Sequence, residues 1–227
     1  SFLRSLMLTT TNQYKLNKSI SKGWTTAGLN LAPANAAALA TGRPRLGTVC
    51  PMAGACAKAC LQYTGMNQMT THATVRVNRT IQLLDHWDET IATLIAEIRK
   101  LKSKHKKFAY RPNLLSDLPQ LAHELASALP DVQFYDYTKI LGRKTGDIPN
   151  YHLTFSNADG NINDVLGAKQ AGLNIAVVFR KELPSTYLGR KVINGDETDL
   201  RFLDEKNVIV GLKAKGKAKK DTSGFVV

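Results

Sequence analysis

The feature that most constrains the fold is an alternation of short β-rich runs with helical segments. Five runs follow residue 107, and their sequences are FAYRPN, VQFYDYT, YHLTFS, NIAVVF and NVIVGL. An earlier run, GWTTAGLNLAP, ends at Pro33 and predicts the first core strand. Strands that alternate with helices form mostly parallel sheets. The chain is therefore expected to be an α/β protein with an open sheet or a partial or full (β/α) barrel, and we favour the barrel-like form.

The segments between these runs have helical periodicity. Apolar residues recur at helical spacing in three of them, and the inward-facing sets are Trp87/Ile91/Leu94/Ile95/Ile98, Leu118/Leu121/Leu125/Leu129 and Ile162/Val165/Leu166. Asp117 is a good N-cap for the second of these helices. A short helix is also predicted at residues 36–40.

The size and composition predict a single domain. With 227 residues, 43% of them hydrophobic and 22% charged, the chain is long enough for one well-buried core. We divide it into an N-terminal extension at 1–22, a cysteine-bearing loop at 34–71 and a basic C-terminal segment at 213–227. No apolar run approaches the roughly 20 residues of a membrane span.

The three cysteines and the sequence of residues 1–8 suggest in which cellular compartment the protein occurs. The start SFLRSLML has no small-residue cleavage pattern, and three clustered cysteines are a poor disulfide framework. We expect a cytoplasmic protein, in the host cytoplasm if a phage encodes it.

All three cysteines lie in one short block, Cys50-Pro-Met-Ala-Gly-Ala-Cys56-Ala-Lys-Ala-Cys60. The small residues between them allow tight coiling, so the three thiolates would converge on one point. A [4Fe–4S] cluster normally takes four thiolates, and three would leave one iron open to a small molecule. Zinc is the alternative, with His72 or a water as the fourth ligand. Packed thiols without a metal are the third possibility.

Polar side chains recur where successive β-rich runs end. These residues are Arg111, Asn113, Asp136, Lys139, Ser156, Asn157, Arg180, Lys181, Lys213 and Lys215. The carboxyl ends of strands build the site in α/β barrels, and the cysteine loop follows the first strand at that same end. Loops between strands and helices are polar in any protein, so the argument rests on the recurrence. It predicts one mouth that holds the cysteines and these groups.

The residue types suggest roles around a substrate in that mouth. Asp136, Asp117 and Lys139 are the candidate catalytic residues, since carboxylates can orient or deprotonate substrate groups. Asp136 lies between two tyrosines in a strand, where a structural role is harder to see, whereas Asp117 also suits a helix cap. The candidate substrate-binding residues are Arg111, Asn113, Ser156, Asn157, Arg180, Lys181 and Lys213, which suit a carboxylate, a phosphate or an amide.

The formal net charge of +13 suggests an anionic partner, of which nucleic acid is the commonest. Many of the cations fall in two runs, RKLKSKHKK at 99–107 and KAKGKAKK at 213–220. Such runs are also common as solvated helix faces or loose tails. Two hypotheses result: an iron–sulfur enzyme acting on a small molecule, nucleotide or nucleic acid, and a nucleic-acid-binding protein whose thiols hold zinc or nothing.

Several blocks together resemble a known family. The order VCPMAGACAKACL, TVRVNRT, RPNLLSDLP, INGDETDLRFLD and VIVGLKAKGKAKKD is similar to the uncharacterised phage and plasmid family called gene product eighty-eight. The resemblance spans residues 15–227, and its most specific parts are the cysteine block and the stretch from Gly195 to Asp204. It implies an origin in a mobile genetic element.

A looser similarity is to radical S-adenosylmethionine enzymes. They also carry three cysteines in the loop after the first strand of a partial barrel, and their open iron binds the amino-acid end of S-adenosylmethionine. Their usual spacing is Cys-x3-Cys-x2-Cys, whereas here five and three residues separate the cysteines. No GxGxxG, GxxxxGK[ST] or His-Glu-x-x-His motif occurs, which removes the common nucleotide-fold, kinase and metalloprotease classes.

Overall fold

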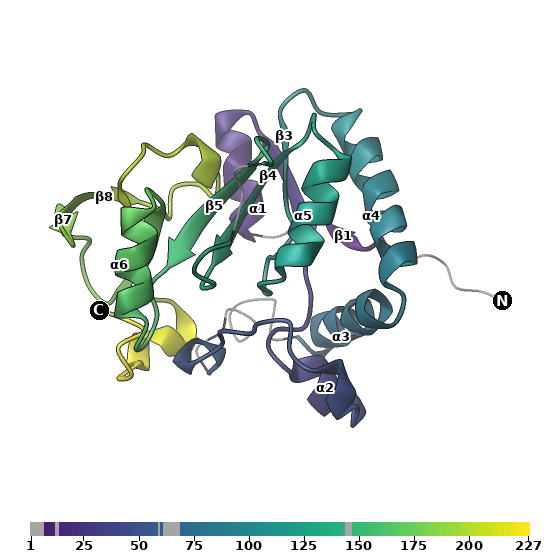
Figure 1. The fold of residues 1–227 in the computed structure, drawn as a ribbon, viewed down its shortest axis with the longest axis horizontal. Helices are drawn as coiled ribbons and strands as arrows, with labels where there is room; N and C mark the ends of the chain where they lie inside the picture. The colour runs from purple at the N-terminus through teal and green to yellow at the C-terminus, as the bar shows by residue number, and fades with distance from the viewer. Residues whose placement is uncertain (1–6, 12–13, 59, 61–68, 144–146) are drawn as a thin grey trace.

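The sheet dominates the computed structural model, which describes residues 7–11, 14–58, 60, 69–143 and 147–227. In this part of the chain nine strands form one sheet in the order β1-β2-β3-β4-β5-β6-β9-β8-β7 (Figure 1). The strands are β1 (Thr9–Thr10), β2 (Thr25–Leu29), β3 (Phe108–Arg111), β4 (Gln133–Thr138), β5 (Tyr151–Ser156), β6 (Asn174–Phe179), β7 (Thr186–Tyr187), β8 (Arg190–Asn194) and β9 (Ile209–Lys213). Neighbours from β2 to β8 are parallel, and the edge strands β1 and β7 are antiparallel to their partners.

The sheet is open. The six predicted strands are all present, and they lie side by side in the sequential order that a barrel would have. Strand β8 pairs with the outer side of β9, however, and β7 and β1 form the two edges, so β9 does not return to β2. The fold is thus a mostly parallel α/β sheet, and the full-barrel alternative is wrong. Strands β1, β7 and β8 were not predicted.

The four longest α-helices cover one face of this sheet. The α-helices are α1 (Tyr14–Asn17), α2 (Ala36–Thr41), α3 (Thr70–Asp85), α4 (Trp87–Lys102), α5 (Pro119–Ala128) and α6 (Ile162–Gln170), and the 3-10 helices are η1 (Lys18–Lys22), η2 (Pro44–Leu46), η3 (Ala55–Ala57), η6 (Arg201–Leu203) and η7 (Gly216–Lys220). Helices α3 to α5 bury their apolar faces against β2 to β5, and α6 packs on β5, β6 and β9. We call this side the helix face. The opposite face contacts α1, η1 and η6.

Helix α4 shows how sequence and packing agree. Ile91, Leu94 and Ile98 are buried in the main core, and Trp87 and Ile95 pack against it, as the periodicity predicts. Its first turn carries two acidic residues and its last turn three basic ones, which complements the helix macrodipole. Helix α6 differs from the prediction, because Val165 is buried whereas Ile162 and Leu166 remain exposed. Ala168 takes the inward position instead, since α6 touches the sheet along a narrow stripe.

The carboxyl ends of the parallel strands lead into the least regular segments of the chain. These segments are the cysteine-bearing loop, the segment before α5, the segment after β4, the segment before α6 and the C-terminal segment, and they gather along the lower edge in Figure 1. One edge of the sheet therefore carries the loops that can build a site. No helix in the described residues is long and apolar enough to span a bilayer.

Candidate functional site

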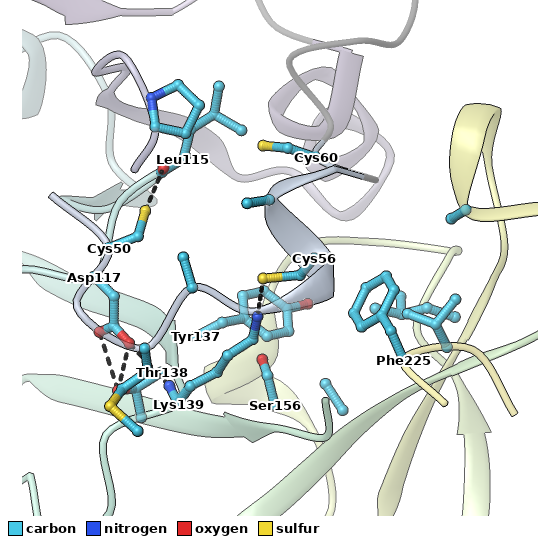
Figure 2. Close-up of a pocket in the computed structure, with 18 of the residues that line it drawn as sticks. Cys50, Cys56, Cys60, Leu115, Asp117, Tyr137, Thr138, Lys139, Ser156 and Phe225 are labelled. Atoms are coloured by element: carbon cyan, nitrogen blue, oxygen red, sulfur yellow. Dashed lines mark hydrogen bonds between the residues drawn. The ribbon is translucent and has the colours of Figure 1, made fainter. Parts of the chain in front are cut away.

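A cavity of about 270 Å³ opens at the carboxyl ends of the parallel strands. All three cysteines line it, together with residues from β3, β4, β5, β6 and β9 and from the C-terminal segment. Figure 2 shows the three cysteines around one side of this space, with Lys139 and Phe225 reaching in from other segments. The predicted mouth is therefore present, and the cysteine-bearing loop forms one of its walls.

Cys50 is held by two backbone contacts. The Ala34 N–H donates to the Cys50 Sγ at 3.3 Å, and the thiol donates to the Leu115 carbonyl at 3.3 Å. Ala34 has a φ of +51°, a conformation that costs an alanine about 1–2 kcal/mol. Its carbonyl also accepts the Val49 N–H at 3.0 Å. Strain of this kind persists where surrounding contacts fix it, and here those contacts orient Cys50 toward the cavity.

The Cys50 thiol resists ionisation. Burial raises its pKa to about 11, and the neighbouring Cys60, Asp117 and Cys56 act in the same direction, whereas the Ala34 N–H acts against them. Like charges gathered at one place disfavour each other. A cationic metal at this position would reverse the balance and favour the thiolate.

Cys56 is positioned by an anchor from the segment between β5 and α6. Both carboxylate oxygens of Asp159 accept the Ala55 N–H, at 3.1 and 3.2 Å. Gly54 makes this approach possible, because a Cβ there would lie 2.8 Å from Asp159 Oδ2. The Lys139 ammonium then contacts the Cys56 Sγ (Figure 2).

Cys60 lines the cavity and lies near the side chain of Arg76. Burial lowers the pKa of Arg76, whereas the negative charge of a Cys60 thiolate would raise it. Among the residues described, no three His, Cys, Asp or Glu side chains are arranged as a ready-made metal site. His72, the predicted zinc ligand, is exposed in the first turn of α3 and does not line the cavity. The thiols thus share one cavity without forming a closed ligand set.

Most of the predicted site residues meet in this cavity. Besides the cysteines, the structure brings together Arg111, Asp117, Lys139, Ser156, Asn157 and Lys213. Within the described part of the chain, Asn113, Asp136, Arg180 and Lys181 do not line it. The prediction that these four side chains lie in the mouth is therefore wrong, and their positions explain why.

Asp136 points to the helix face. Phe134 and Asp136 alternate along β4 with Tyr135 and Tyr137, so one pair faces the helices and the other faces away, and only Tyr137 reaches the cavity. Asp136 is fully buried and accepts hydrogen bonds from the Asn113 N–H at 2.9 Å and from the Asn113 Nδ2 at 2.8 Å. The Tyr151 hydroxyl donates to it at 2.9 Å. Burial raises the pKa of Asp136, whereas the positive charge of Arg143 and the hydrogen bonds from Asn113 lower it by a smaller amount.

Asn113 links this buried carboxylate to the cavity wall. Its Oδ1 accepts the Ser116 hydroxyl at 2.7 Å and the Leu118 N–H at 2.9 Å. The segment that it holds carries Leu115, which accepts from Cys50, and Asp117. Asn113 and Asp136 therefore support the site from behind.

Asp117 lines the cavity but does not cap α5, whose N-cap residue is Leu118 without a side-chain cap. Its carboxylate instead accepts from the Thr138 hydroxyl, the Lys139 N–H and Arg143, at 2.7 to 3.0 Å. Burial raises the pKa of Asp117, whereas these donors lower it. The capping interpretation is therefore wrong, because Asp117 binds the end of β4.

Arg180 and Lys181 are exposed at the end of β6. The Arg180 guanidinium donates to the carbonyls of Lys219 at 2.9 Å and Asp221 at 2.6 Å, and its N–H donates to Val227. Arg180 thus holds the C-terminal segment in place instead of lining the cavity.

The cavity and anchor residues that the sequence did not predict include Tyr137, Arg143, Asp159, Asp196 and Phe225. Tyr137 could have been considered from the sequence. Side chains alternate along a strand, so Asp136 and Tyr137 cannot both face the cavity, and Tyr137 is the alternative to Asp136. Phe225 carried no signal, because it reaches the site only when the C-terminal segment folds back beside β6.

The sequence profile of the family described as Gene product 88 matches residues 6–227, and the chain belongs to this family. No curated protein matches the chain. No solved structure matches it either. The resemblance to gene product eighty-eight is confirmed, whereas these comparisons lend no support to the similarity with radical S-adenosylmethionine enzymes.

Proposed function

We propose that this protein is an iron–sulfur enzyme, with Cys50, Cys56 and Cys60 holding a [4Fe–4S] cluster whose fourth iron is open. The observation that carries the proposal is that every cysteine of the chain lines a single cavity at the carboxyl edge of a parallel sheet. Three soft thiolate donors are the chemistry that such a cluster takes, and the Ala34 N–H to Cys50 Sγ contact is of the kind that tunes cluster potential.

The donor set fits a cluster, although the ligands are not assembled. Cys56 would exchange its contact with the Lys139 ammonium for iron, and Cys50 would lose its proton to become a ligand. The high pKa of Cys50 is then offset by the charge of the metal. When bound, the cluster would supply one-electron chemistry and an open coordination position.

The surrounding side chains favour an anionic substrate such as a carboxylate or a nucleotide. Lys139, Lys213 and Arg111 line the cavity, and Arg111 also pairs with Asp199 at 3.0 Å. Asn157 and Ser156 offer hydrogen-bonding groups beside them. Asp117 would hold or move a proton there, because burial moves its pKa toward neutrality.

S-adenosylmethionine is a candidate ligand for the open iron, on the similarity to radical S-adenosylmethionine enzymes alone. Zinc in place of the cluster is the second candidate, because three cysteines and one water complete its tetrahedral site. A [4Fe–4S] cluster contributes four iron atoms per chain and a brown colour, whereas a zinc site contributes one zinc atom and no colour. A single preparation therefore distinguishes the two sites.

Anaerobic purification followed by iron, sulfide and zinc analysis and an absorption spectrum tests the proposal. We expect brown protein with about four iron atoms per chain. Cys50→Ala, Cys56→Ala and Cys60→Ala should each lower bound iron by at least about tenfold. Ser156→Ala, which alters the cavity wall at the end of β5 and leaves the described contacts of the cysteines in place, is the matched control and should retain the cluster. Colourless protein with one zinc would replace the iron–sulfur proposal with the zinc alternative.

A further inference from the structure

The basic run at 213–220 is an ordered part of the cavity wall. The Ala214 N–H donates to Phe179 at 2.9 Å, and the Val227 N–H donates to Val178 at 3.0 Å. Ala214 and Ala218 are buried together with Val226. Small apolar residues thus fasten the segment at four-residue spacing, and the loose-tail interpretation of KAKGKAKK does not hold.

Because the alanines face inward, the lysines between them are held at defined places. We call Lys213, Lys215, Lys217, Lys219 and Lys220 the mouth lysine run. Lys213 and Lys215 line the cavity, and the other three are exposed in η7 beside it. Lys213 pairs with the exposed Glu182 at 3.2 Å, and Lys215 pairs with Asp196. Between residues 213 and 221 the sequence has five lysines and one aspartate, so the net charge of this stretch is strongly positive.

The other basic run, at 99–107, lies at the opposite end of the sheet. It ends helix α4 and immediately precedes β3, whereas the mouth lysine run begins at the last residue of β9. The two therefore flank the amino and carboxyl ends of parallel strands, as the upper and lower parts of Figure 1 show. A single anion bound at the cavity would contact the mouth lysine run and not the run at 99–107.

An aromatic ring packs against the alanines between these lysines, because Phe225 contacts the buried cluster of Ala214, Ala218 and Val226. Phe225 lines the cavity, and the Lys139 ammonium is 5.7 Å from the centroid of its ring (Figure 2). Tyr137 lines the same space, with the Arg111 guanidinium 4.6 Å from its ring centroid. Lysines along a surface with aromatic faces beside them are the combination that single-stranded nucleic acids bind, because phosphates pair with the cations and bases stack on the rings.

We propose that single-stranded nucleic acid binds along the mouth lysine run and places one base against Phe225 in the cavity. The inference rests on the proposed function for what happens to that base, but the binding itself is independent of the cluster. An anionic membrane would also be drawn to the lysines. It has no base to fill an aromatic-walled cavity, and nucleic acid is therefore favoured.

The test measures fluorescence anisotropy of a labelled 20-nucleotide single-stranded DNA with the full chain over a range of salt concentrations. The triple variant Lys217→Glu/Lys219→Glu/Lys220→Glu should weaken binding at least tenfold and make the salt slope less steep by about 2, at about 0.7 per phosphate contact. The matched control, Lys102→Glu/Lys104→Glu/Lys106→Glu, makes the same charge change at the other end of the sheet and should stay within about twofold.

Phe225 separates stacking from charge attraction. Phe225→Ala should weaken binding about tenfold without changing the salt slope, whereas Phe225→Tyr keeps the ring and should bind normally. Circular dichroism checks that each variant is folded. The proposal is overturned if both triple variants lose binding equally, or if anionic phosphatidylserine vesicles bind and the oligonucleotide does not. Iron content is measured on the same samples, so that unsubstituted protein that binds the oligonucleotide but contains no iron contradicts only the proposed function.

Discussion

The two faces of strand β4 carry polar groups in very different states. Behind the strand, Asp136 is enclosed by Asn113, Tyr151 and Arg143, and each of its oxygens has a donor. In front of it, Tyr137 and Lys139 border a cavity of about 270 Å³ whose thiols and cations have room for a ligand. A buried polar group with all its partners present stabilises the fold, whereas groups that face an open space can bind something. Burial and charge alone would have ranked Asp136 first, and only its partners show that it is structural.

The largest expected effect comes from breaking the network behind β4. Asp136→Ala leaves the buried donors of Asn113 and Tyr151 without their acceptor, so the free energy of unfolding should fall by about 3 kcal/mol or more in urea titrations. Asp131→Ala, which removes an exposed carboxylate just before the same strand, should change it by less than about 0.5 kcal/mol. A stable Asp136→Ala protein that binds iron normally but lacks activity would instead make Asp136 a catalytic candidate again.

The next largest effect is on the reactivity of Cys50, which lines the cavity in front of β4. Because burial raises its pKa to about 11, the neutral thiol persists well above pH 7 and the thiolate appears only at high pH. Iodoacetamide should therefore modify Cys50 about 100-fold more slowly at pH 8 in the folded metal-free protein than in urea, because the thiolate is the nucleophile. Mass spectrometry of the peptide that contains Cys50 measures the rate.

The raised pKa of Cys50 also makes the free energy of unfolding depend on pH. The folded state keeps the proton that the unfolded state loses, so this thiol contributes stability below about pH 9 that is lost as the pH rises toward 11. If folded and unfolded protein show the same alkylation profile, Cys50 is not enclosed as described.

The smallest effect concerns Asp159, which anchors the loop that carries Cys56. Asp159→Ala frees the Ala55 N–H and loosens the loop that carries Cys56, so bound iron should fall about tenfold while the free energy of unfolding changes by about 1 kcal/mol or less. Gly54→Ala should act similarly, because its new Cβ would displace the same carboxylate.

A double-mutant cycle sharpens this test. If Gly54 matters only because Asp159 needs the space, Gly54→Ala should add little to Asp159→Ala. Additive losses would mean that the glycine supports the loop in another way.

The amino-acid sequence determined the six central strands and the location of the cavity. Periodicity predicted the core strands and the inward face of α4, because these patterns report which residues a local element can bury. It also located the mouth, since parallel strands bring their carboxyl ends to one edge. Cys50, Cys56 and Cys60 therefore share a cavity with groups from distant strands, as expected.

The tertiary structure decided what depends on pairing between distant segments. Asp136 and Tyr137 are adjacent in β4, so their side chains point to opposite faces of the sheet. The alternation in the sequence does not show which of these two faces carries the cavity. The open sheet depends on β8 adding beside β9, and Phe225 enters the cavity only because Arg180 and β6 hold the end of the chain. Such contacts join residues far apart in sequence, so no local pattern encodes them.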